Sequence, residues 1–207
     1  AQALRAEGFD VSIHEEISAL AVGSFFEGYT PVAEAYADMY QLAAERPDLV
    51  KLVVYGRSWR RVQDSAAGHE LIALCITKMR PNDCALNPDT DKPRMLLMAG
   101  IHAREIATPE LAMRWVGHLV STYDIFPETT ALLDYNELWV IPFVNPDGSD
   151  IVAAGGTHGL EHRKNANNSQ GNCTDLPPDI TYGSYHFGVD LNRNFDYQWG
   201  NKDVASS

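Results

Sequence analysis

The stretch LLMAGIHAREIATPE, residues 96–110, decides the fold class. It joins a continuous apolar run over residues 94–99, which is typical of a fully buried β-strand, to a helix-start signal at Thr108-Pro109. His102 and Glu105 stand between these two elements. Ligand sites in open α/β sheets lie at that edge, where strands end and the following helices begin. The stretch therefore predicts an α/β layer architecture with candidate functional residues at 102–105.

The segments on either side continue the alternation of helices and strands. Thr30-Pro31 is a helix-start signal, followed by apolar residues at helical spacing, and Thr108-Pro109 opens a second, amphipathic helix. Strands are expected over residues 49–55, 71–77 and 137–144, the first two joined by a hairpin-type connection and the third closed by a turn at 145–148. We place the start of the domain near Tyr29 and interpret residues 1–28 as a lead-in segment.

Composition limits the classes of partner. The chain has 207 residues, which is typical of one large domain rather than two. Its formal net charge is −12, so its long-range field repels phosphate backbones and anionic lipid surfaces. The longest apolar run, Met95 to Ile101, is far shorter than the roughly 18 residues that a membrane span needs. We therefore expect neither a nucleic-acid partner nor a membrane partner.

The three cysteines leave the disulfide pairing open. Cys75 lies in an apolar segment and is interpreted as a buried small hydrophobic residue. Cys84 and Cys173 lie in turn-rich stretches that would tolerate a disulfide. Because the count is odd, at least one cysteine is free or pairs outside this chain.

His102 and Glu105 are the candidate metal ligands. An imidazole and a carboxylate three residues apart can converge on one cation, and zinc suits a mixed set of nitrogen and oxygen ligands. The same spacing recurs at His158 and Glu161, where no strand precedes it and no helix start follows, so we interpret that second match as chance. The spacing alone is therefore weak evidence, and other residues must decide.

Four motifs in order supply that evidence. They are GIHAREIATPE (100–110), NPDG (145–148), HRKN (162–165) and GVDLNRNFD (188–196). With these separations the sequence resembles the zinc carboxypeptidase family, which includes the digestive carboxypeptidases and bacterial relatives. The resemblance covers most of residues 29–207 and implies a three-layer α/β/α fold with a mixed, largely buried sheet. It also implies a secreted protein, in which residues 1–28 resemble the tail of a propeptide.

The resemblance implies a metal site and its support. His102 and Glu105 match two of three ligands of a catalytic Zn²⁺. Asp190 matches the carboxylate that hydrogen-bonds the non-ligating nitrogen of the histidine and fixes its orientation. Arg163 matches the arginine that polarises the scissile carbonyl and holds the oxyanion.

The resemblance also implies a peptide site, whose ligand is a peptide or protein with a free C-terminus. Asn192 and Arg193 match the pair that binds the C-terminal carboxylate of the substrate, for which a guanidinium offers a bidentate fit. Arg104 matches a position that lines the outer peptide subsites, although it fits a plain solvated side chain equally well.

Two functional residues of the family have no counterpart here. The third zinc ligand, a histidine, and the general base, a glutamate, lie well C-terminal of the NRN motif in the family, and after Arg193 this sequence has neither residue type. His186 is the one plausible substitute ligand. We therefore expect an incomplete catalytic domain, truncated on its C-terminal side, that binds zinc weakly and has little peptidase activity. We also expect an unpaired strand edge through which copies associate.

Two other functions remain open at this point. Related zinc folds with similar His-x-x-Glu sites remove acyl groups from small N-acyl amino acids. A non-catalytic module could instead keep Asn192 and Arg193, bind C-terminal peptides and hold no metal. A peptide with a free C-terminus, compared with the same peptide amidated, separates the peptidase from the deacylase.

Overall fold

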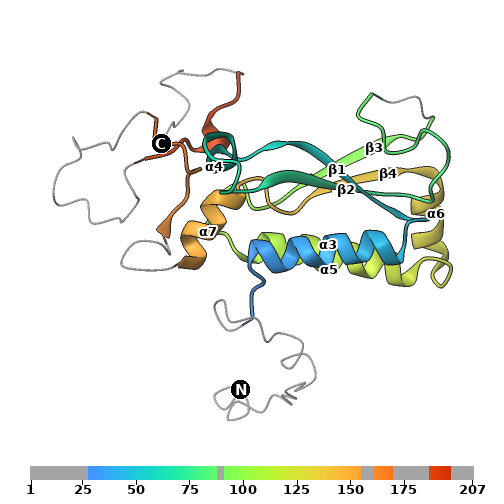
Figure 1. Ribbon diagram of the computed structural model, residues 1–207. Coiled ribbons are helices and arrows are strands. Elements are labelled where there is room, and N and C mark those ends of the chain that lie inside the picture. Colours follow the sequence, from blue (N-terminus) through green and yellow to red (C-terminus); the bar gives the residue numbers. More distant parts are fainter. Residues whose placement is uncertain (1–27, 88–90, 155–160, 170–186, 197–207) are drawn as a thin grey trace, which may run out of the picture. The chain divides into compact units, whose positions relative to one another are not determined.

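The computed structural model describes residues 28–87, 91–154, 161–169 and 187–196 (Figure 1). The chain divides into two compact units, Ala1–Thr30 and Pro31–Ser207, and the fold described below is that of the second unit. None of the helices in the described ranges is long and apolar enough to cross a membrane.

A four-stranded mixed sheet forms the centre of this unit. Its strands are β1 (Val50–Arg57), β2 (Glu70–Ile76), β3 (Arg94–Met98) and β4 (Glu137–Ile141), in the spatial order β1-β2-β4-β3. β2 runs antiparallel to both of its neighbours, whereas β3 and β4 are parallel, with Leu96 beside Trp139. The predicted α/β class and the expected hairpin connection between the first two strands are confirmed. That connection also contains a short helix, α4 (Trp59–Gln63).

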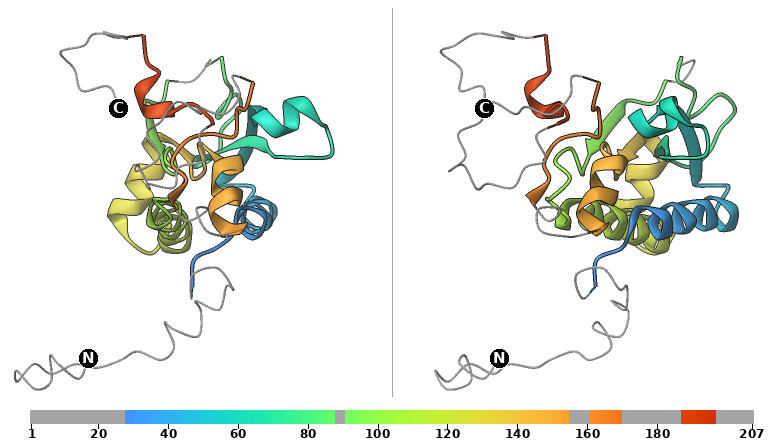
Figure 2. Two further views of the ribbon diagram at one scale, coloured as in Figure 1. Left: turned by 90° about the vertical axis from the view of Figure 1, so that its left-hand side faces the viewer. Right: turned by 60° about the vertical axis from the view of Figure 1, so that its left-hand side comes forward.

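The long helices pack on one face of the sheet. These are α3 (Val32–Glu45) and α5 (Ala107–Thr122), which lie side by side below the strands in Figure 1, and Figure 2 shows α7 (Pro146–Ala154) on the same side. The buried residues of α5 include Ala112, Val116, Leu119 and Val120, whose spacing gives one apolar stripe. This stripe and Met39 of α3 pack against Leu74, Val140 and neighbouring strand residues to form the main core.

The structure corrects two sequence predictions about secondary structure. The NPDG segment, expected to form a turn, instead begins helix α7, because a proline is tolerated in the first helical turn, where its missing N–H costs nothing. In addition, residues Pro127–Tyr135 form a helix, α6, that the sequence analysis did not predict.

The predicted burial of residues 94–99 is also wrong for most of the strand. Within the described residues β3 pairs only with β4, and Leu96 is 57% exposed. Met95 and Met98 are exposed as well. The apolar run correctly predicted a strand, but burial also depends on what covers that strand, which a local pattern does not reveal.

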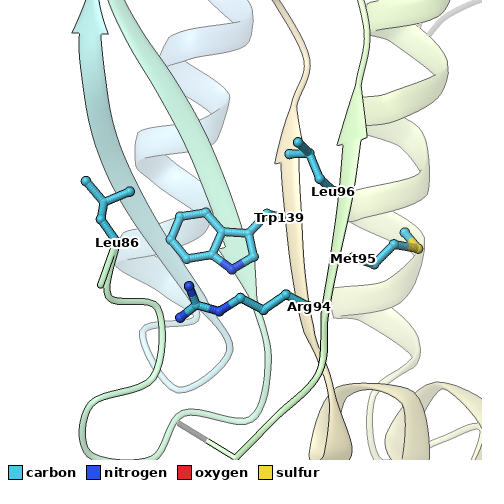
Figure 3. A pocket seen from close by; sticks show the side chains of 5 residues that line it. All are labelled: Leu86, Arg94, Met95, Leu96 and Trp139. Atoms are coloured by element: carbon cyan, nitrogen blue, oxygen red, sulfur yellow. The ribbon is translucent and has the colours of Figure 1, made fainter. Parts of the chain in front are cut away.

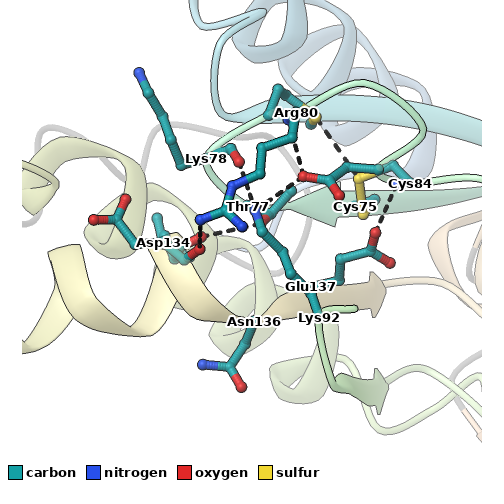
Figure 4. A network of polar contacts seen from close by, with 12 residues as sticks. Cys75, Thr77, Lys78, Arg80, Cys84, Lys92, Asp134, Asn136 and Glu137 are labelled. Atoms are coloured by element: carbon teal, nitrogen blue, oxygen red, sulfur yellow. Dashed lines mark hydrogen bonds and ion pairs between the residues drawn. A yellow bond between two sulfur atoms is a disulfide. The ribbon is translucent and has the colours of Figure 1, made fainter. Parts of the chain in front are cut away.

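The amino ends of β3 and β4 are fixed by a buried polar network and a disulfide (Figure 4). The disulfide joins Cys75 of β2 to Cys84. Cys75 is buried as predicted, but it is half of a disulfide and not a free packing residue, and the pairing of Cys84, left open by the sequence, is with Cys75. Cys173 lies outside the described residues. The two sulfur atoms can meet because the chain turns back at Cys84, whose φ is 59°.

Candidate functional site

The candidate site lies at the carboxyl ends of the parallel strands β3 and β4. The chain leaves β3 through Gly100, which has a φ of 61° and packs so closely that an added Cβ would lie 3.0 Å from the carbonyl oxygen of Pro142. The following residues carry the His102 and Glu105 side chains before α5 begins. Thr108 fixes this passage: its hydroxyl accepts from the backbone N–H of Gly100 and donates to the carbonyl of Glu105. Ligand sites of α/β sheets commonly occupy this position.

His102 and Glu105 face each other. Nδ1 of His102 lies 2.7 Å from Oε1 of Glu105, and the backbone N–H of Glu105 donates to the His102 carbonyl, which keeps both side chains on one side of the turn. The imidazole is buried, whereas the Glu105 side chain is 46% exposed. One nitrogen and one oxygen donor thus converge at a position open to solvent.

Asp190 joins the histidine to the predicted arginine. Its Oδ1 lies 3.3 Å from His102 Nε2, which has no well-aligned hydrogen-bond partner, so the contact is mainly electrostatic. Its Oδ2 accepts from Nε of Arg163 at 2.8 Å. The Nη1 atom of Arg163 lies 3.7 Å from Oε1 of Glu105. The structure therefore brings together four residues that the sequence analysis selected from three separate segments.

The surroundings keep Asp190 ionised. Burial alone raises its pKa, but the hydrogen bonds from Arg163 and from the backbone N–H of Asn192, with the charge of the guanidinium, outweigh that effect and lower the pKa below its ordinary value. An anionic Asp190 favours a proton on Nε2 of His102. A cation bound between Nδ1 and Glu105 Oε1 would take the place of the proton that these two atoms otherwise share, and with Nε2 protonated toward Asp190 the Nδ1 atom can ligate it.

The predicted peptide-binding residues lie at the rim. Asp190 caps a short 3₁₀ helix, Leu191–Arg193, by accepting from the Asn192 N–H, and both Asn192 and Arg193 are exposed. Arg193 is also close to its own backbone, since Nη1 donates to the Asn192 carbonyl. Arg104 is exposed and reaches the Glu161 carbonyl at 3.5 Å. Two other histidines considered above, His158 and His186, lie outside the described residues.

Asp147 and Asn145, which connect the segments of the site, were not predicted from the sequence. The side chain of Asp147 accepts from the Ser58 hydroxyl at 2.7 Å and from the backbone N–H of Arg60 at 2.8 Å, which fixes α4 to the start of α7. The amide of Asn145 contacts the segments on both sides of the site, as described below. The NPDG motif was the available signal, but it was interpreted as a turn.

The donor set fits part of a zinc site. Imidazole nitrogen and carboxylate oxygen are ordinary zinc ligands, and a carboxylate on the far ring nitrogen is the usual support of a ligating histidine. The 2.7 Å approach of Nδ1 and Oε1 meets the requirement that both ligand atoms face one point. His102 and Glu105 therefore supply two of the donor atoms that a zinc site needs.

Comparison with known proteins decides the family. A family model described as "Zinc carboxypeptidase" matches residues 35–207. The chain belongs to the zinc carboxypeptidase family. A zinc carboxypeptidase of Saccharothrix mutabilis subsp. capreolus is 31% identical over 177 residues, a match that covers 86% of this chain and 34% of the relative. Carboxypeptidase A2 of Rattus norvegicus is 31% identical over 187 residues, covering 89% and 37%.

Solved structures agree with this assignment. The crystal structure of thrombin activatable fibrinolysis inhibitor superposes with a TM-score of 0.65 at 26% identity, covering 89% of this chain and 39% of that one. The chain thus spans about a third of the length of the curated zinc carboxypeptidases that it matches. The resemblance drawn from the four motifs is confirmed, and zinc is the metal of the family.

Proposed function

We propose that the protein to which these residues belong is a zinc metallocarboxypeptidase, which hydrolyses the C-terminal peptide bond of peptides or proteins. The observation that carries the proposal is the convergence of His102 Nδ1 and Glu105 Oε1 at 2.7 Å, beside the Arg163 guanidinium 3.7 Å from the same oxygen. A pair of metal ligands and a fixed cation at one strand edge form part of the arrangement that zinc-dependent peptide hydrolysis needs.

Each group has a distinct part in this reaction. Zinc, held by His102 and Glu105, would supply a Lewis acid and an activated water. Asp190 orients His102 and, through the same carboxylate, aims Arg163 at the site. Arg163 then stabilises the negative charge that develops on the carbonyl oxygen. Asn192 and Arg193 bind the terminal carboxylate, which limits hydrolysis to the last peptide bond.

Residues 1–207 by themselves are expected to hydrolyse peptides poorly. Residues 194–207 hold neither a histidine nor a glutamate, so they offer no counterpart to the family's third ligand or general base. We assign residues 29–207 to the catalytic domain and residues 1–28 to a propeptide-like lead-in. Secretion fits this assignment, because disulfides such as Cys75–Cys84 persist in oxidising compartments.

A calorimetric zinc titration of this chain tests the metal site. We expect weak one-to-one binding that the His102→Ala variant abolishes. The matched control is His118→Ala, which removes an exposed histidine from α5. Zinc binding that is unchanged by His102→Ala, or equally reduced by His118→Ala, would contradict the assignment of His102 as a ligand.

A second experiment tests the substrate class in a longer form of the protein. We expect the protein to release the last residue from a peptide with a free C-terminus and not from the same peptide amidated. The reason is that Arg193 binds the terminal carboxylate, which the amide lacks. Equal cleavage of small N-acyl amino acids would favour the deacylase. Binding of the free peptide without zinc and without hydrolysis would favour a non-catalytic module.

Self-association through β3 is part of the proposal for the isolated residues 1–207. A hollow of about 290 Å³ lies on the sheet face beside this edge, lined by Leu86, Arg94, Met95, Leu96 and Trp139 (Figure 3). Exposed apolar side chains on an unpaired edge favour pairing with another strand. Light scattering should detect oligomers that the Leu96→Lys variant reduces to monomers, and a monomeric parent chain would contradict the proposal.

A further inference from the structure

The NPDG segment contacts both loops of the site, the one that carries His102 and the one that carries Arg163. It has no part in the reaction proposed above. Asn145, its first residue, is only 2% exposed. Its backbone N–H donates to the Gly100 carbonyl at 3.1 Å. Its side-chain Nδ2 donates to the Lys164 carbonyl at 2.8 Å and approaches the Ile101 carbonyl at 3.4 Å. A single buried side chain therefore contacts the residue before His102 and the residue after Arg163.

We infer that Asn145 is a positioning residue, whose carboxamide fixes the loop carrying His102 relative to the loop carrying Arg163. The inference rests on the proposed function in that these loops form the hydrolytic site. Among the described residues, the Ala103 N–H joins the two loops directly by donating to the Arg163 carbonyl at 3.2 Å. Without the Asn145 amide, that bond and the contacts of Asp190 would have to keep the two loops in register.

The contacts require an amide. Nδ2 of Asn145 donates to two backbone carbonyls, and its Oδ1 accepts from the Gly148 N–H at 3.1 Å. Asparagine offers donors and an acceptor on one planar group. An aspartate of the same shape would place oxygen against both carbonyls, which would repel it.

Gly148 provides the space that the amide occupies. A Cβ at position 148 would lie 2.7 Å from Oδ1 of Asn145 and would also collide with its Nδ2 and Cγ. Gly148 lies in α7, where alanine is otherwise the better helix former. The glycine is thus explained by the room that the Asn145 side chain needs.

Amide hydrogen exchange of the Asn145→Asp variant tests the inference. We expect exchange at the Ala103 N–H to rise at least tenfold and the NMR signal of Arg163 Nε–H to shift, while amides of β2 and β4 keep their rates. The matched control is Asn136→Asp, since Asn136 Nδ2 also donates to a carbonyl, that of Leu132 at the end of α6. Unchanged exchange at Ala103, or an equal rise throughout the sheet, would overturn the inference.

Gly148→Ala is a second variant, which keeps Asn145 but removes the space that its side chain occupies. If the amide positions the loops, this variant reproduces the local changes at Ala103 and Arg163 although Asn145 is retained. If the amide does not position the loops, the Asn145 side chain is displaced by the new Cβ and both signals stay unchanged, which overturns the inference even where Asn145→Asp fails to fold. These readouts need neither zinc nor peptide, so failure of the zinc titration would contradict the proposed function alone.

Discussion

The two ends of the parallel strands β3 and β4 are both rich in charge, but the charges are arranged differently. At the amino ends, Lys92 pairs with Asp83 at 2.9 Å, with their side chains 3% and 2% exposed. At the carboxyl ends, Glu105 lies near Arg163 with side chains 46% and 24% exposed. The ion pair at the amino ends is buried, whereas the pair at the carboxyl ends is partly exposed to solvent.

The amino-end network is saturated as well as buried (Figure 4). Lys92 Nζ also donates to the Thr77 hydroxyl and the Lys78 carbonyl. Glu137, fully buried, accepts from the Cys84 N–H and the Trp139 indole and pairs with Arg94 at 2.7 Å. Because Asp83 and Glu137 are each paired with a cation and hydrogen-bonded, this end has a structural role. At the other end, the exposed Glu105 remains accessible to a cation.

The largest expected effect on stability comes from breaking the buried ion pair at the amino ends of β3 and β4. Lys92→Met should cost about 3–5 kcal/mol, because Asp83 would remain buried without its cation. Urea unfolding measures the loss. The matched control is Lys78→Met, which breaks an exposed pair with Asp48 and should cost under about 1 kcal/mol. Equal losses in the two variants would show that burial does not distinguish the pairs.

The disulfide should contribute the next largest effect. Cys75 and Cys84 are nine residues apart, and closing a loop of that size removes unfolded-chain entropy worth about 2–3 kcal/mol. The Cys75→Ala/Cys84→Ala double variant should lower the unfolding free energy by that amount in the absence of reductant. The parent chain treated with a dithiol should approach the variant, while the variant itself should not respond. A dithiol effect of equal size on the variant would contradict the assignment.

Features that depend on a local sequence pattern were predicted well, and features that depend on contacts between distant segments were predicted poorly. The apolar stripe of α5 and the strand runs give their elements directly, because periodicity records which face is buried. Proline and glycine in NPDG are compatible with a turn and with a helix start, so that segment was misassigned. The Cys75–Cys84 bond depends on how the loop returns to β2, which spacing alone does not reveal.

The site shows the same division. His102, Glu105, Arg163 and Asp190 were found through four motifs in order, and the structure brings them together. The NPDG motif marked Asn145, but its contacts could not be predicted, because its partners are backbone groups. Backbone groups carry no sequence signature, so a buried amide that binds them resembles any loop asparagine.

A smaller loss of stability is expected when Asp190, at the carboxyl ends of β3 and β4, loses its charge. Asp190→Asn removes the charge that holds Arg163 and contacts His102, and should cost about 1–2 kcal/mol at pH 7 in urea unfolding. The variant should also bind zinc more weakly, because His102 loses its orienting carboxylate. Asp196→Asn, at an exposed position nearby in sequence, is the control and should change neither quantity. A loss comparable with that of Lys92→Met would make this end structural too.

The smallest effect tests whether burial, rather than charge, separates the two classes of pair. Asp48 pairs with Arg46 at 3.0 Å and with Lys78 at 3.2 Å, and its side chain is 44% exposed. The hydrogen bond from Arg46, aided by Lys78, lowers the pKa of Asp48 to about 2. Solvent screening limits the contribution of such a group to below about 1 kcal/mol.

The pH dependence of Asp48 follows from the sign of that shift. A lowered pKa means that the folded state favours the charged carboxylate, so the stabilisation is complete above the ordinary pKa of 3.8 and disappears as the pH falls through about 2. The difference in unfolding free energy between the parent chain and Asp48→Asn should therefore be small at pH 7 and vanish only below pH 2, once Asp48 is protonated in both states. A difference that stays constant down to pH 2 would mean that the carboxylate acts through packing instead of charge. Solvent screening of the charge on Asp48 would then no longer explain why Lys78→Met lowers the unfolding free energy less than Lys92→Met does.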